Sequence, residues 1–175
     1  MSLFKKSLKG LPFLILFIAG TASAASTTVT VGSKASVAPT IELIVQGQKD
    51  SELRFGDVLP SASGESTTGP MTMRVEVQSN TGERYQVTHH LNNPLQNESG
   101  IAIPLENLSF TSKSSHSKGT VYESPVELTP EQQTVFISDA AGMGDTVFID
   151  YSLKVPAKQA PGNYSTTITY TASTL

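Results

Sequence analysis

The residues near the end of the chain alternate between two faces of an extended strand, and this alternation constrains the fold more than any other feature. It follows the turn residues Pro161 and Gly162. The parity that carries the apolar residues consists of Tyr164, Thr166, Ile168, Tyr170 and Ala172. The other parity is entirely Ser and Thr from residue 165 to residue 171. A period of two, with β-branched and aromatic residues, predicts a half-buried β-strand that needs a neighbour along each edge.

Similar segments recur along the chain between turn signals. The predicted strands span residues 41–45, 53–56, 71–78, 84–91, 101–103, 108–111, 125–129, 134–138 and 146–155. Asn80 and Gly82 are typical of a hairpin turn, so residues 84–91 are expected to pair with residues 71–78. No segment has a convincing helical period. Many short strands separated by turns predict an all-β, immunoglobulin-like Greek-key β-sandwich.

The first 25 residues have the pattern of a secretory signal peptide. A basic N-terminal region contains Lys5, Lys6 and Lys9, and an apolar run follows from residue 11 to residue 19. Small residues near Ala24 suit cleavage by a signal peptidase. The apolar run is shorter than the ~20 residues that span a bilayer. We therefore expect export through the inner membrane, with no integral membrane segment after signal cleavage.

The charge and cysteine content narrow the classes of partner and chemistry. The chain has 12 Lys+Arg and 15 Asp+Glu, and three of the lysines lie in the signal, so the mature protein has 9 basic against 15 acidic residues, a net charge of −6. This balance argues against nucleic acid as a partner. There is no Cys, so the fold must depend on burial and β pairing, without disulfides or thiol chemistry.

Residues 26–37 form a second alternating segment, ahead of the predicted domain at residues 38–175. One parity holds Val29, Val31, Ser33, Ala35 and Val37. Pro39 interrupts the pattern because it cannot donate a ladder hydrogen bond. Such a segment can pair within its own domain or act as an arm that pairs elsewhere.

No catalytic or metal-binding pattern emerges from the sequence. His89 and His90 are adjacent on a predicted strand and therefore point to opposite faces, so they cannot chelate one metal. We expect them to be ordinary surface or boundary histidines. Asp139, Asp145 and Asp150 lack the spacing of a calcium loop. We expect no cofactor, no metal and no enzymatic activity.

Three blocks together resemble the structural subunits of chaperone–usher pili. They are residues 38–43 (APTIEL) after the arm, residues 53–58 (LRFGDV) with 73–77 and 82–87, and residues 155–170. The order and spacing are similar to the archaic, spore-coat-U-like pilins, whereas the absence of Cys is more similar to the CFA/I-type pilins. Archaic pilins usually carry a disulfide, and the cysteines expected near Ile41 and Val77 are missing here.

The resemblance implies an incomplete sandwich that is completed by a donor strand from another subunit. By resemblance, the donor is the arm around residues 28–37, with Val29, Val31, Ser33, Ala35 and Val37 facing inward. The implied acceptor groove consists of Ile41, Leu43, Val45, Tyr164, Ile168, Tyr170 and Ala172. The implied partners are a periplasmic pilus chaperone, an outer-membrane usher and other pilin subunits. The expected route leads to the periplasm and then to the cell surface, where the pilus serves adhesion or biofilm formation.

Two other functions stay open at this point. One is a secreted β-sandwich binding module whose loops recognise a glycan or a host surface protein. The other is a small secreted hydrolase, against which the sequence offers only the lack of a catalytic set.

Overall fold

A computed structural model describes residues 35–47, 55–58, 64–116 and 118–175. The chain divides into two units, Met1–Ser36 and Val37–Leu175. Within the first unit, the two described residues, Ala35 and Ser36, are exposed and have no regular secondary structure. The folded architecture belongs to the second unit.

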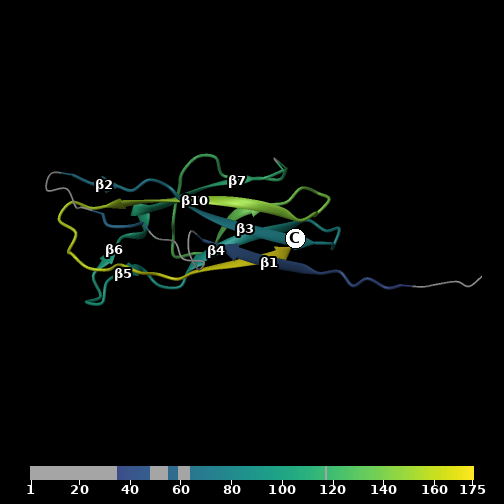
Figure 1. The fold of residues 1–175 in the computed structure, drawn as a ribbon, viewed down its shortest axis with the longest axis horizontal. Coiled ribbons are helices and arrows are strands. Elements are labelled where there is room, and N and C mark those ends of the chain that lie inside the picture. Colours follow the sequence, from purple (N-terminus) through teal and green to yellow (C-terminus); the bar gives the residue numbers. More distant parts are fainter. Residues whose placement is uncertain (1–34, 48–54, 59–63, 117) are drawn as a thin grey trace, which may run out of the picture. The chain divides into compact units, whose positions relative to one another are not determined.

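The second unit is an all-β sandwich, which confirms the predicted fold class. Its strands are β1 (Ile41–Gln46), β2 (Ser66–Thr67), β3 (Met71–Ser79), β4 (Tyr85–Leu91), β5 (Leu95–Gln96), β6 (Ala102–Ile103), β7 (Leu108–Ser114), β8 (Val126–Glu127), β9 (Gln133–Ile137), β10 (Asp145–Val155) and β11 (Ile168–Thr174). A short 3-10 helix, η1 (Leu105–Asn107), precedes β7. Figure 1 shows this arrangement.

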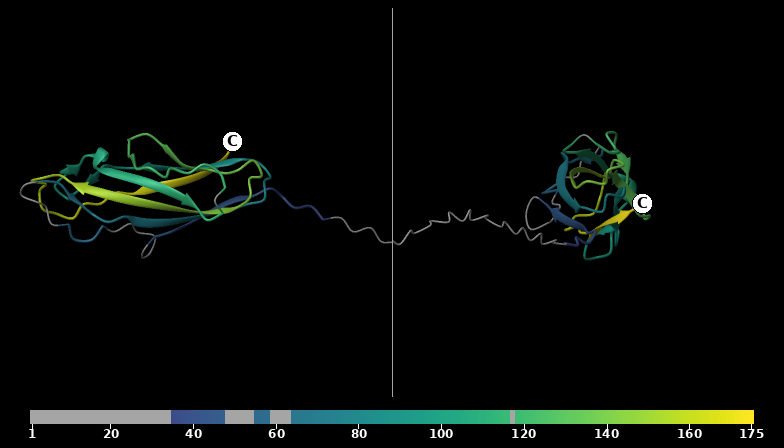
Figure 2. Two further views of the ribbon diagram at one scale, coloured as in Figure 1. Left: turned by 90° about the horizontal axis from the view of Figure 1, so that it is seen from above. Right: turned by 90° about the vertical axis from the view of Figure 1, so that its right-hand side faces the viewer.

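The strands form two main antiparallel sheets. One sheet has the order β1-β3-β10-β7-β8, with β2 pairing β10 at the side, and the other has the order β11-β4-β9. A third, two-stranded sheet joins β5 to β6. Figure 2, left, shows the teal-green β7 and the yellow-green β10 running antiparallel beside each other. The core lies between the inner faces of the two main sheets.

Sequence alternation places the core side chains. Val75 of β3 lies opposite Val147 of β10, and both are fully buried. Arg74 and Glu76, on either side of Val75 along β3, face outward and pair with each other. On β4 the inward parity is buried throughout, at Tyr85, Val87, His89 and Leu91, and Thr88 on the other parity is buried as well. The inward-facing residues of β3 and β4 belong to facing sheets and share one core, as expected when each sheet buries one face.

The predicted hairpin between β3 and β4 is wrong. β3 is flanked by β1 and β10, and β4 is flanked by β11 and β9, so the turn at residues 80–84 carries the chain from one sheet to the other. Both strands are apolar on one face. They bury these faces against each other, which edge-to-edge pairing in one sheet would not do. Gly82, at φ 68°, supplies the left-handed turn residue.

Two other strand predictions need correction. Phe55 and Gly56 are not in a strand, and Gly56 has a φ of 71°, which breaks extended structure; residues 53 and 54 lie outside the described part of the chain. The last strand begins at Ile168, four residues after Tyr164. Before it, Ser165 makes only an isolated bridge to Gln96.

Candidate functional site: an open edge between two sheets

Two edge strands, β1 and β11, lie next to each other at one flank of the sandwich (Figure 1). Among the described strands, β1 pairs only with β3, and β11 pairs only with β4. They belong to different sheets and do not pair with each other. This flank is therefore a place where both sheets end.

The apolar residues of both edge strands face the core. In the register of β1 with β3, Leu43 lies opposite Val77, which is 2% exposed. In the register of β11 with β4, Ala172 lies opposite Val87 and Ile168 lies opposite Leu91, and both partners are buried. Residues directly opposite in a ladder share a face, so the edge residues point into the sandwich.

These edge residues are nevertheless only partly covered. The half-buried apolar residues that face the core from the two strands are Ile41, Leu43, Val45, Ile168, Tyr170 and Ala172. Their cross-strand partners at Val75, Val77, Val87 and Leu91 are buried. The sandwich therefore has a core face that its own described strands leave partly accessible along this flank.

The opposite flank is closed by backbone hydrogen bonds. Thr120 and Ile137 donate to each other's carbonyl oxygens, at N–O distances of 2.7 and 3.1 Å, which extends the sheet beyond β9. Two residues later, the Tyr122 carbonyl accepts from the N–H of Ser112 on β7 at 2.7 Å, and the Ser112 hydroxyl donates to the Val135 carbonyl of β9 at 2.7 Å. One segment thus joins both sheets here, whereas β1 and β11 at the other flank are not paired with each other.

A buried polar chain ends at the open flank. Nδ1 of His89 lies 2.7 Å from the Tyr151 hydroxyl, which lies 2.9 Å from the Tyr170 hydroxyl. His89 is 1% exposed, so the expectation that it is a surface or boundary residue is wrong. Burial lowers the pKa of His89 to about 4, against a smaller opposing effect of the Gln133 amide. Burial raises the pKa of both phenols well above their ordinary value, so both stay neutral.

The seventh predicted groove residue, Tyr164, is placed differently. It precedes β11, and its half-buried hydroxyl donates to the Ala160 carbonyl at 2.7 Å and accepts from the Gln159 amide at 2.8 Å. These contacts hold the turn before the strand. The structure therefore brings together the predicted groove residues of β1 and β11 but sets Tyr164 apart from that pair.

The predicted donor residues fall mostly outside the described residues. Three of them, Val29, Val31 and Ser33, lie outside the described residues. Ala35 is exposed without regular structure, and Val37, at the start of the second unit, is 81% exposed. Their role as a donor strand stays a prediction.

A second polar cluster surrounds the carboxylate of Asp145, which is buried at the start of β10. The carboxylate accepts hydrogen bonds from Ser114, from Ser115 at 2.8 Å and from the Thr146 N–H at 2.7 Å, and Nδ1 of His116 lies 2.9 Å away. Burial raises the pKa of Asp145, but these bonds outweigh it, so the pKa lies below its ordinary value. Both serine hydroxyls bond the carboxylate. A hydrolytic triad would instead have a serine on the free nitrogen of the histidine.

The other acidic residues considered for calcium have separate partners. Asp139 caps a turn by accepting from the Ala141 N–H at 3.1 Å. Asp150 lies on the outward parity of β10, where Thr72 donates to it at 2.6 Å and the ammonium of Lys113 lies 3.4 Å away. Asp145 and Asp150 are five residues apart on one strand and so face opposite sides.

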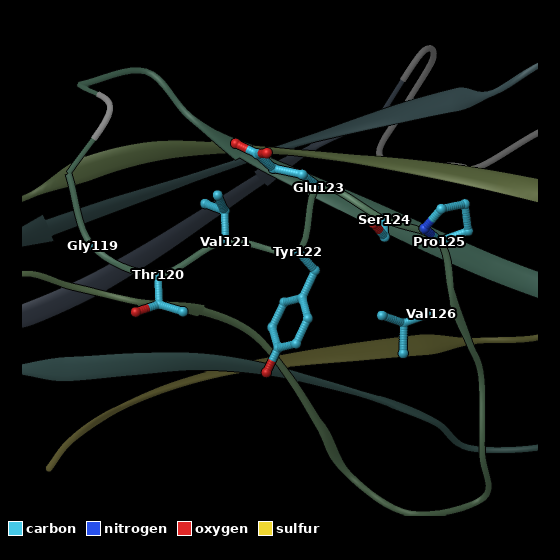
Figure 3. Close-up of a pocket in the computed structure, with 8 residues that line it drawn as sticks. All are labelled: Gly119, Thr120, Val121, Tyr122, Glu123, Ser124, Pro125 and Val126. Atoms are coloured by element: carbon cyan, nitrogen blue, oxygen red, sulfur yellow. The ribbon is translucent and has the colours of Figure 1, made fainter.

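A shallow hollow lies over residues 119–126 (Figure 3). The close-up shows Thr120 and Tyr122 pointing to one side of the segment, and Val121 and Glu123 to the other. The Tyr122 ring meets Phe110 edge-on, with centroids 5.8 Å apart, so it is part of the packing. Because one contiguous segment lines the hollow, it is the inner side of a loop.

Comparison with known proteins adds no assignment, since no protein-family model and no curated protein sequence matches the chain. In the described ranges, helical structure nowhere has the length and hydropathy needed to cross a bilayer.

Proposed function

We propose that this protein is a structural subunit of a surface pilus that polymerises by donor-strand complementation and serves adhesion or biofilm formation. The observation that supports this most is the flank between β1 and β11, where two sheets end side by side with half-buried core faces. An extended segment added at such an edge gains ladder hydrogen bonds and buries alternate side chains.

The arm has the pattern that this flank requires. Its apolar parity would face the core next to Leu43 and Tyr170, and its other parity, which holds Thr28, Thr30, Gly32, Lys34 and Ser36, would face water. Burying Val29, Val31 and Val37 would contribute ~1.5–3 kcal/mol each, before the cost of ordering the arm. A head-to-tail contact of this kind does not close on itself, so it propagates into a fibre.

The proposal includes a pathway and its partners. After signal removal, a periplasmic pilus chaperone would cover the flank, an outer-membrane usher would receive the subunit, and the arm of the next subunit would replace the chaperone. The final location would be the cell surface. The role of the chaperone follows from the same physics, because an uncovered apolar edge promotes aggregation.

The test uses two variants of the mature protein, one with an inactive donor arm and one with an inactive acceptor flank. Val31→Asp should inactivate the donor, with Thr30→Asp as a control on the opposite parity. Leu43→Lys should inactivate the acceptor, with Ile44→Lys as a control on the outward face of β1, opposite Glu76. Each inactivated variant alone should stay monomeric in light scattering.

Mixing the two inactivated variants should give dimers and nothing larger, because only one productive junction remains. The control variants should form long oligomers like the unmodified chain. The proposal fails if the unmodified mature protein is a stable monomer on which neither inactivating change has any effect. An arm that inserts into its own chain would leave the mixture monomeric and would also overturn the polymer.

A further inference from the structure

The polar chain described above connects the edge strand β11 to the deepest part of the core. His89 and Tyr170 are directly opposite each other in the β4–β11 register, and their ring centroids are 6.4 Å apart. Tyr151, from the other sheet, bonds both side chains. When β11 moves away from β4, His89 therefore loses the cover that Tyr170 gives it.

The surroundings of His89 suit a neutral imidazole. Phe110 of β7 meets the ring edge-on at 4.6 Å, and Tyr151 of β10 stacks at 5.8 Å. Among the described residues, Nε2 of His89 has no hydrogen-bond partner. The structure thus gives this ring one close hydrogen bond, to Tyr151, among aromatic side chains, with the Gln133 amide as its other polar neighbour.

The groups that face His89 do not compensate a positive charge. Tyr151 of β10 and Tyr170 of β11 are neutral phenols. Gln133 of β9 is uncharged, and the neighbouring His90 would repel a second cation. No carboxylate of the described residues acts on the ring.

Protonation of His89 would also disturb the hydrogen bonds. Imidazolium donates from both nitrogens, so Nδ1 must donate to the Tyr151 oxygen and Tyr151 must donate to Tyr170. In the closed state the new N–H at Nε2 has, among the described residues, only the Gln133 amide as an acceptor, and that amide oxygen already accepts from the Thr129 N–H. A buried cation without a counter-charge and a donor that must compete for its acceptor both favour a state in which water reaches the ring.

We propose that His89 is an acid sensor for the β11 edge: its protonation drives β11 away from β4 and opens the core at this flank. Water then solvates the imidazolium from the side that Tyr170 had covered. The inference concerns the β4–β11 pair itself and stands whether or not a donor strand binds there.

Hydrogen–deuterium exchange of the mature full chain, read by mass spectrometry, tests this directly. Peptides that cover β11 are compared at pH 7.5 and pH 5.0 after correction for intrinsic exchange, with peptides from β3 as reference. If His89 titrates near its ordinary value of about 6.5 when open and near 4 when closed, protection of β11 falls about 30-fold over this interval. Protection of β3 should stay constant.

Two further measurements make the result specific. His89→Gln removes the titration and should abolish the acid effect on β11, whereas the matched change His90→Gln, on the outward parity of β4, should leave it intact. If His89→Gln does not fold, the exchange of histidine C2 hydrogens in the unmodified chain gives the midpoint of His89 directly. The proposal is overturned if that midpoint lies near 6.5, if β11 protection is equal at the two pH values, or if His89→Gln retains the effect.

Discussion

Leu43→Ala should destabilise the protein much less than Leu108→Ala, although both changes remove the same atoms from the inner face of the same sheet. Leu108 of β7 is 2% exposed, so its truncation loses the transfer free energy and leaves an enclosed cavity. Such changes cost about 3–5 kcal/mol. Leu43 of β1 is half-buried at the open flank, so only part of the transfer free energy is lost and no closed cavity forms. We expect a cost of about 1 kcal/mol.

The free energy of unfolding is measured by urea titration of both truncations in a Val31→Asp background, which is expected to stay monomeric, with far-ultraviolet circular dichroism as the signal and equal m-values as the criterion for comparison. A peptide with the sequence of residues 26–37 is then added in excess. Once it covers the flank, Leu43→Ala should cost about 3 kcal/mol, because its site has become enclosed. The cost of Leu108→Ala should not change.

Two outcomes would refute this reasoning. Equal costs for the two truncations in the monomer would mean that the flank is already closed around Leu43. A cost for Leu43→Ala that stays near 1 kcal/mol with bound peptide would mean that the peptide binds elsewhere.

Three further predictions address other parts of the domain. Gly142→Ala should lower the melting temperature in a thermal scan, because Gly142 has a φ of 58° and an added Cβ would collide with the Glu83 backbone. Ser112→Ala should cost about 1–3 kcal/mol in urea titration, since it leaves the buried Val135 carbonyl without its donor. The carboxylate of Asp145 has a lowered pKa in the fold, so its stabilisation is full above the unfolded value of about 3.9 and is lost as the pH falls through the lower, folded value. Asp145→Asn should therefore reduce stability at pH 7 and flatten its decline below pH 4, as measured by urea titration at a series of pH values.

The positions of strands could be predicted from the sequence where one face of the strand is buried and the other is exposed to solvent. The alternation of residues 71–78 predicted β3 to within one residue at its end, together with its inward side chains, because a register shift of one residue would expose Val75 and Val77. The same parity rule places His89 with Tyr85, Val87 and Leu91 on the inner face of β4. The expectation of a surface or boundary histidine followed from residue type, whereas the parity of the strand places His89 in the core.

Pairing could not be predicted from these patterns. A turn signal between two apolar strands fits a hairpin in one sheet or a crossing to the facing sheet, and only the other neighbours of β3 decide between them. The closed flank at Thr120–Tyr122 depends on single bridges, which leave no periodic signal. For the candidate groove, the predicted residues of β1 and β11 face the core, as their alternation indicates. Tyr164 also packs against the core, but it precedes the strand, which starts at Ile168, and its hydroxyl bonds within the preceding turn.

The position of β10 at the centre of its sheet also governs how fast the domain can form. β10 pairs with β3 and β7, strands that precede it by long stretches of sequence, so the sheet must close large loops before it gains its main contacts. Chains dominated by such distant pairings fold on a timescale of milliseconds to seconds. During synthesis from the N-terminal end, β1 and β3 emerge well before β10, and during this interval they lack that partner and are exposed to aggregation.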